Sequence, residues 1–200
     1  MSIKELIKKV IGYSNVKMDS NYYRELGAVI GDNVKFNSGY PIDMNFPWLI
    51  TIGNNVTLAS NVRLLAHDAS TALVEDVHTK LGIVKIGDNV FIGADSVVLC
   101  NVRIGDNVVI GANSVVTHDI PSNSVYAGNP AKYICSFDEF SKKHKNNQIS
   151  HPIFRKYRWY DWPNASAEEK EQMRKEQTSE KQIYSFALAM LATRRPRRSP

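Results

Sequence analysis

The sequence predicts an all-β fold, a stack of triangular coils with parallel strands, flanked by a short N-terminal helix and a helical C-terminal extension. Two columns of residues with a six-residue period predict the coils. The first column is aliphatic apart from one phenylalanine, and its period fits neither an α-helix nor a lone amphipathic strand. Its members are Ile30, Phe36, Ile52, Leu58, Leu64, Ile86, Ile92, Val98, Ile104, Ile110 and Val116.

The second column stands three residues after the first and consists of Asn, Asp and Gly with one exception, His67. These residue types tolerate a left-handed backbone conformation, so each of them predicts a corner between two short strands. Three strands and three corners close one coil, the step from Ile86 to Ile104. Stacked coils would bury the aliphatic column. The predicted corner residues are Asn33, Gly39, Asn55, Asn61, His67, Asn89, Asp95, Asn101, Asn107, Asn113 and Asp119.

The period breaks twice, between Phe36 and Ile52 and between Leu64 and Ile86. The second break predicts a loop at about 70–84 that leaves the surface of the coils just after His67. Loops on rigid scaffolds commonly carry function. The start of this excursion loop is therefore the first place to look for a site.

The chain divides by pattern into three regions. These are 1–28, with a helix over Met1–Gly12 and a lead-in; 29–135, with the coils; and 136–200, where the period is lost. In the last region we expect one helix over Phe137–Lys145 and another over Ser166–Leu191, with an irregular aromatic stretch between them. Ser166 and Glu169 have the spacing of a capping box at the start of the second helix.

Charge is unevenly distributed along the chain. The formal net charge is +5, but residues 1–135 are close to neutral and the basic excess lies in the extension, which ends in a basic stretch expected to be disordered. This argues against nucleic acid as a partner, because the coils have no basic excess and the basic end is expected to be solvated or to touch an acidic surface. No apolar stretch is long enough to span a membrane, and two cysteines without a metal or disulfide pattern suit the cytoplasm.

Five segments resemble the hexapeptide-repeat acyltransferases, and within them the branch of galactoside and maltose O-acetyltransferases with their capsule and exopolysaccharide relatives. They are Pro47–Val56, Leu64–Thr71, Val90–Ala94, Ser114–Pro121 and Ala127–Lys132. The His-Asp-Ala-Ser element and the Gly-Asn-Pro-Ala-Lys ending are the most specific of them. The resemblance, which covers about 29–134, implies a left-handed parallel β-helix, a homotrimer with active sites between subunits, and transfer of an acetyl group from acetyl-CoA to a sugar hydroxyl in polysaccharide biosynthesis.

His67 is the candidate general base. An imidazole can take a proton from a hydroxyl near neutral pH, and the resemblance implies that this histidine activates the acceptor for direct attack on the thioester. The alternative is a harmless corner variant, since histidine tolerates the left-handed region. Asp68 is the candidate to orient the imidazole, although it can equally be a turn residue bonded to its own backbone.

The resemblance also implies positions that contact the two substrates. Ala94 and Ala112 match positions that line the pantetheine groove, and Thr117 matches a position near the adenine. His118 stands where relatives often have a lysine facing the phosphates, and Lys132 matches a basic position that reaches them or is simply solvated. For the acceptor, polar residues of the first break are candidates, or ordinary loop residues: Asn37, Asp43 and Asn45. Tyr40 and Trp48 can stack on a sugar or pack on the first coil.

Three other functions are compatible with the same pattern. The acceptor can be an amine of an amino sugar or an antibiotic hydroxyl. A metal enzyme of this fold needs three histidines that converge on one metal, and only His67 and His118 lie in or beside suitable coils. His78, His144 and His151 have no partners at metal-ligand spacing, so no metal is expected. A non-catalytic scaffold is the last alternative, and His67 beside the excursion loop argues against it.

Overall fold

The computed structural model describes residues 19–37, 39–149, 153–158, 164–177 and 184–186. The chain divides into two compact units, Met1–Phe137 and Asp138–Pro200. The helix expected over Met1–Gly12 and the basic end of the chain lie outside the described residues.

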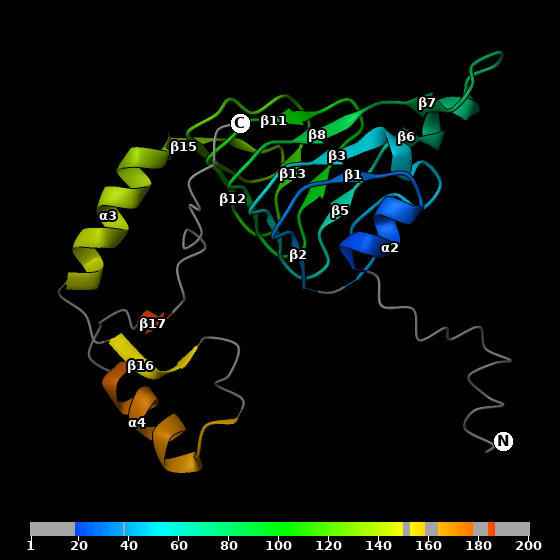
Figure 1. Ribbon diagram of the computed structural model, residues 1–200. Helices are drawn as coiled ribbons and strands as arrows, with labels where there is room; N and C mark the ends of the chain where they lie inside the picture. The colour runs from blue at the N-terminus through cyan, green and yellow to red at the C-terminus, as the bar shows by residue number, and fades with distance from the viewer. Residues whose placement is uncertain (1–18, 38, 150–152, 159–163, 178–183, 187–200) are drawn as a thin grey trace, which may run out of the picture. The chain divides into compact units, whose positions relative to one another are not determined.

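Three sheets form the faces of a parallel β-helix in the first unit (Figure 1). Strands of successive coils pair in parallel with equivalent residues opposite each other, as Ile52 does with Ile30 and Ile86. The first sheet contains β1 (Val29–Ile30), β3 (Ile50–Ile52), β8 (Val84–Ile86) and β11 (Arg103–Ile104). The second contains β5 (Arg63–Leu64), β10 (Val97–Val98) and β13 (Val115–Val116). The third contains β2 (Lys35–Phe36), β4 (Thr57–Leu58), β9 (Phe91–Ile92), β12 (Val108–Ile110), β14 (Ser124–Ala127) and β15 (Lys132–Ser136), of which β15 alone runs antiparallel to its neighbour.

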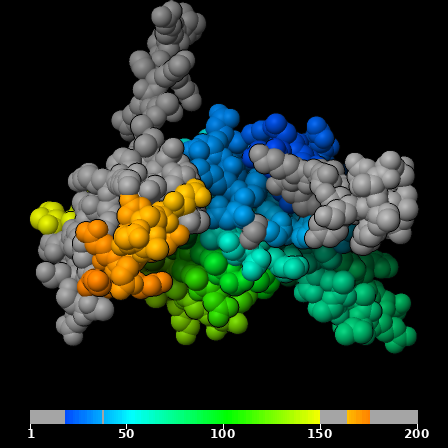
Figure 2. All heavy atoms as spheres, turned by 90° about the horizontal axis from the view of Figure 1, so that it is seen from below, coloured from blue at the N-terminus to red at the C-terminus, as the bar shows by residue number. Residues whose placement is uncertain are grey.

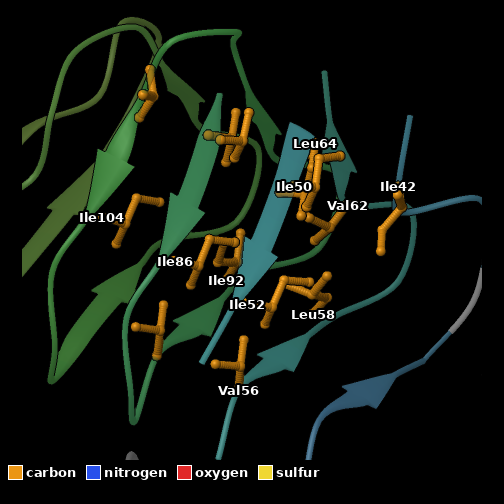
Figure 3. Close-up of a cluster of buried hydrophobic side chains, with 14 of the residues drawn as sticks. Ile42, Ile50, Ile52, Val56, Leu58, Val62, Leu64, Ile86, Ile92 and Ile104 are labelled. Carbon is orange, nitrogen blue, oxygen red and sulfur yellow. The ribbon is translucent and has the colours of Figure 1, made fainter. Parts of the chain in front are cut away.

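The predicted aliphatic column fills the interior of the coils (Figure 3). Ile52, Ile86 and Ile104 come from the first sheet, while Leu58 and Ile92 come from the third, and all five are almost completely buried. Each side chain is covered by the coils above and below it. Truncating one of them to alanine leaves a cavity that costs about 2–5 kcal/mol of folding stability.

The corners have the predicted left-handed backbone at every corner residue except His67 and Asp119. Positive φ angles occur at Asn33, Gly39, Asn55, Asn61, Asn89, Asp95, Asn101, Asn107 and Asn113. At one corner the side chains also bond to each other along the stack: Asn55 Nδ2 donates to Asn89 Oδ1 at 3.2 Å, and Asn89 Nδ2 donates to Asn107 Oδ1 at 3.2 Å. Asparagine therefore serves both the backbone conformation and the contact between coils.

Both breaks in the repeat occur at the same corner of the coil. The first coil keeps its period through Ile42, which pairs in parallel with Leu64, so the break is confined to 43–49, between Ile42 and β3. This first insertion contains the short 3-10 helix η1 (Pro47–Leu49). The second insertion follows Leu64, which pairs with Ile42. The two insertions therefore project from adjacent coils and lie side by side.

The second insertion is the excursion loop. It contains β6 (His67–Asp68), the 3-10 helix η2 (Ala69–Leu73) and β7 (Lys80–Leu81), and β6 pairs antiparallel with β7. Figure 1 shows this hairpin beyond the end of the sheets, and Figure 2 shows the loop, in teal, projecting from the surface. The interpretation of His67 as a corner residue is wrong, because His67 is extended and lies in a strand.

Helix α2 (Ser20–Glu25) packs on the first coil. Asp19 caps its N-terminus by accepting hydrogen bonds from the backbone of Asn21 and Tyr22. Tyr23 is completely buried, and its ring centroid lies 5.3 Å from that of Phe36. The N-terminal end of the aliphatic column is therefore covered by an aromatic side chain.

The second unit contains α3 (Phe137–Ile149), β16 (Ile153–Arg158), α4 (Ala167–Gln177) and β17 (Tyr184–Phe186). The predicted capping box is formed, since Glu169 N donates to Ser166 Oγ and Ser166 N donates to Glu169 Oε2. The prediction of a helix continuing to Leu191 is wrong, because β17 pairs in parallel with β16. A distant strand partner supplied the hydrogen bonds there, and a local apolar pattern cannot reveal such a partner.

Candidate active site

His67 Nδ1 is hydrogen-bonded to the carboxylate oxygen Oδ2 of Asp43. The Asp43 side chain is 3% exposed, whereas the imidazole is 26% exposed. Because an ionised carboxylate only accepts hydrogen bonds, Nδ1 carries the proton and the lone pair of the ring lies on Nε2. The imidazole therefore has one nitrogen held by the protein and the other able to accept a proton.

Asp43 has two further hydrogen bonds that hold it in place. The backbone N–H of Ala66 donates to Oδ2 at 2.9 Å, and that of Asn45 donates to Oδ1 at 3.0 Å. Burial acts to raise the pKa of Asp43, but the hydrogen bonds from His67, Ala66 and Asn45 outweigh it and lower the pKa below its usual value. The carboxylate is consequently ionised at neutral pH beside the imidazole.

Asp68, the residue expected to orient His67, has a different set of partners. Its Oδ1 accepts hydrogen bonds from Ser70 N at 3.0 Å and Ser70 Oγ at 2.5 Å, and these bonds lower the pKa of Asp68. It caps the N-terminus of η2. Successive side chains of a strand point to opposite faces, so in β6 the imidazole faces Asp43 while Asp68 faces the loop. The partner of Nδ1 is Asp43 and not Asp68.

The excursion loop is held closed by Thr71. Its hydroxyl donates to the carbonyl oxygen of His78 at 2.8 Å and accepts a hydrogen bond from Lys80 N at 3.1 Å. These bonds tie η2 to β7, which pairs with the strand that contains His67. The loop also exposes large apolar side chains: Leu73, Val74, Val77, Leu81 and Ile83.

One aromatic ring from the first insertion adjoins the imidazole, and a second ring adjoins the first. The ring centroid of Phe46 lies 5.3 Å from that of His67, and the centroid of Trp48 lies 5.8 Å from that of Phe46. Phe46 is half-buried, whereas Trp48 is 59% exposed. The first insertion thus supplies the carboxylate, the ring against the imidazole and an exposed indole.

The three residues expected to bind the acceptor are placed differently. Asp43 is buried against His67, so its carboxylate is already used within the protein. Asn45 lies beside it with an exposed side chain. Asn37 follows β2, whose backbone pairs with β4, and therefore lies at another corner from His67. Of these three residues, Asn45 combines an exposed side chain with a place in the insertion that bonds to the imidazole.

Four of the five residues expected to contact the donor occupy two corners, and Lys132 lies in a strand. Ala94 and Ala112 repeat one position on adjacent coils, between the third and second sheets, and Asn113 N donates to Ala94 O at 2.7 Å. Thr117 and His118 follow β13, at the corner where His67 follows β5, and Thr117 Oγ1 is 2.8 Å from His118 Nδ1. Lys132 is exposed at the start of β15, opposite Ala127.

Within the ranges that the structure describes, no group of three or more His, Cys, Asp or Glu side chains is arranged to hold a metal ion. None of the helices in those ranges is long and apolar enough to cross a membrane.

Comparison with known proteins agrees with this architecture. The family described as bacterial transferase hexapeptide (six repeats) matches residues 83–118. Protein CapG of Staphylococcus aureus is 42% identical over 127 residues, which cover 60% of this chain and 72% of CapG. The galactoside O-acetyltransferase of Escherichia coli is 32% identical over 149 residues, which cover 64% of this chain and 73% of that enzyme.

A solved structure supports the fold alone. The hexapeptide-repeat acetyltransferase of Vibrio cholerae superimposes with a TM-score of 0.51 at 23% identity, covering 62% of this chain and 84% of that one. The chain therefore belongs to the hexapeptide-repeat transferase family. Its relatives place it in the acetyltransferase branch, and the prediction that it is an enzyme, an acyltransferase, is confirmed.

Proposed function

We propose that the enzyme transfers an acetyl group from acetyl-CoA to a hydroxyl of a sugar or polysaccharide precursor, with His67 as the general base. The observation that carries the proposal is the hydrogen bond between His67 Nδ1 and the buried carboxylate of Asp43. It gives the imidazole the tautomer that a base needs, with Nε2 unprotonated.

The reaction follows from this arrangement. Nε2 takes the proton of the acceptor hydroxyl while the hydroxyl oxygen attacks the carbonyl carbon of the thioester. The bond between carbon and sulfur then breaks, and the thiolate of coenzyme A leaves with the proton returned by the imidazolium. Asp43 stabilises the imidazolium that exists between these two proton transfers. It is a positioning residue, since it acts through His67 and not on the substrates.

The donor site is proposed at the corner that contains Ala94 and Ala112. Small side chains on adjacent coils leave the backbone of that corner accessible, which suits a narrow chain carrying amides such as pantetheine. Thr117 and His118, which lie at the corner of His67, and Lys132 are the proposed contacts to the nucleotide end, so the groove combines this corner of one subunit with the Ala94 corner of another. The neutral form of His118 has no charge to offer a phosphate, so Lys132 is the side chain that neutralises one there.

We also propose that each subunit is a left-handed β-helix, that three subunits form a homotrimer in the cytoplasm, and that the active site lies between two of them. Ala94 and Ala112 lie at a different corner of the coil from His67, so one subunit does not bring the proposed donor groove and the base together. In a symmetric assembly the groove of one subunit can face the base of the next. The exposed apolar side chains of the excursion loop support an assembly of this kind.

The test is release of coenzyme A thiol from acetyl-CoA with a panel of sugars, nucleotide-sugars and amino sugars. We expect turnover with a sugar hydroxyl and a loss of roughly 10²-fold or more in His67→Ala, the scale of a general base. Acetylation of the amino sugars alone would identify an N-acetyltransferase. No turnover with any acceptor, together with no thermal shift on adding acetyl-CoA, would contradict the proposal and favour a scaffold.

A further inference from the structure

We infer that Trp48 is the platform on which the apolar face of a pyranose acceptor stacks, and that it determines the enzyme's preference for ring sugars over acyclic alcohols. The inference rests on the proposed function of His67. Proton transfer by His67 does not itself require Trp48. The inference also gives the acceptor a shape, because a ring that stacks on an indole presents a face of C–H groups next to the reacting hydroxyl.

Trp48 lies at the outer end of a row of three rings that begins at His67. The rings of His67, Phe46 and Trp48 follow one another, with centroid separations of 5.3 and 5.8 Å. Phe46 covers one side of the imidazole, and Trp48 extends the aromatic surface outward to solvent. The inference places an acceptor whose hydroxyl reaches Nε2 along this row of rings, with its own ring on the indole.

The local structure holds Trp48 outward. It lies in η1 between Pro47, which is buried, and Leu49, which is half-buried, so the helix is anchored on both sides of the exposed indole. A Cβ atom on Gly27 would lie 3.2 Å from Trp48 Cβ, so the base of the side chain rests against the backbone after α2. A side chain supported in this way loses little entropy when a ligand stacks on it.

The first insertion combines an aromatic surface with an exposed polar side chain. Ligand sites join an apolar or aromatic surface with a few polar groups that fix orientation. The first insertion provides both, because the carboxamide of Asn45 is exposed beside Asp43 and the indole is exposed beside Phe46. Sugars match such a surface, since one molecule carries C–H faces and hydroxyl edges.

The experiment compares the wild type with Trp48→Ala, Trp48→Tyr and the control Phe91→Ala, which removes another exposed aromatic side chain from β9. Each variant is assayed with a pyranoside that the wild type acetylates and with glycerol as the acyclic acceptor. We expect Trp48→Ala to raise KM for the pyranoside roughly tenfold, the scale of a lost aromatic contact. KM for acetyl-CoA and the rate with glycerol should change less than about twofold, and Trp48→Tyr should recover most of the affinity.

Binding is measured separately from turnover. The chain contains three tryptophans, so Trp159→Phe with Trp162→Phe leaves Trp48 as the sole tryptophan, which is excited selectively at the red edge of the absorption band. We expect its fluorescence to change on titration with the pyranoside but not with glycerol.

The inference is overturned if Trp48→Ala keeps the wild-type KM for the pyranoside, or if the sole-tryptophan variant shows no response to it. It is also overturned if Trp48→Ala changes the mass of the assembly in sedimentation, because the indole is then a subunit contact. These results leave the transfer reaction standing, whereas failure of the proposed function appears as absence of turnover in the wild type.

Discussion

Replacing Asp43 with asparagine tests the central geometry of the site. The substitution Asp43→Asn keeps the size and shape of the side chain but removes the charge that faces His67 Nδ1. A hydrogen bond to a charged group contributes about 1.5–3 kcal/mol, and 1.36 kcal/mol corresponds to a tenfold change in rate. If the bond acts on the imidazolium of the transition state, kcat/KM should fall roughly 10- to 100-fold.

The assay is thiol release at a fixed neutral pH, with kcat and both KM values determined separately. A positioning role predicts that kcat falls while KM for acetyl-CoA stays unchanged. The role first expected for Asp43, direct binding of the acceptor, predicts instead that KM for the acceptor rises while kcat is kept. The two roles therefore differ in which kinetic constant changes.

Asp68→Asn is the matched control, because it removes a charge from the next acidic residue along the chain. Asp68 caps η2 through Ser70, so we expect a small decrease in thermal stability and a rate within about threefold of the wild type, since its carboxylate does not bond to the imidazole. The reasoning is refuted if Asp43→Asn retains the wild-type kcat/KM, or if Asp68→Asn loses as much activity as Asp43→Asn.

Three further outcomes follow from the structure. Because the pKa of Asp43 is lower in the folded protein than in the unfolded chain, the ionised carboxylate stabilises the fold above the unfolded pKa. This stabilisation is lost as the pH falls through the folded pKa. Acid denaturation followed by circular dichroism should therefore show a smaller loss of stability in Asp43→Asn than in the wild type. Asn89 has a φ of 57°, so we expect Asn89→Ala to lower the free energy of unfolding, measured by urea denaturation, by about 1–2 kcal/mol. Asn89→Gly should lower it less, because glycine tolerates this φ and only the side-chain hydrogen bonds along the stack are lost. Thr71→Val removes the bonds that join η2 to β7; we expect faster proteolysis of the loop and a lower kcat, with Thr71→Ser restoring both, and equal proteolysis of the three proteins would argue against this function of Thr71.

Local patterns were sufficient to predict the coils. The aliphatic column and the Asn, Asp and Gly corners each depend on a few neighbouring residues. Residues such as Ile92 and Asn107 have equivalents in the other coils with a similar local sequence. The backbone angles at the corners follow from the residue types that tolerate them. His67 was identified for a related reason, since it stands where the pattern expects a corner residue.

The partner of His67 was missed because it depends on how coils stack. Asp43 precedes the histidine by 24 residues, and nothing in its own neighbourhood separates it from other loop residues. The available signal was the phase of Ile42, which continues the aliphatic column and places both insertions at one corner. Asp68 was favoured because it is adjacent in sequence, although adjacent residues of a strand face opposite ways.

The sequence by itself determined that the chain coils, where its corners lie and which histidine stands beside the excursion loop, because these features repeat at short range. Only the tertiary structure decided which carboxylate holds the imidazole, which aromatic ring lies against it, and that Tyr184–Phe186 is a strand. Each of these depends on a partner in another coil or another segment. Such contacts are chosen by stacking and strand pairing, which act on residues that are close in space and distant in the chain.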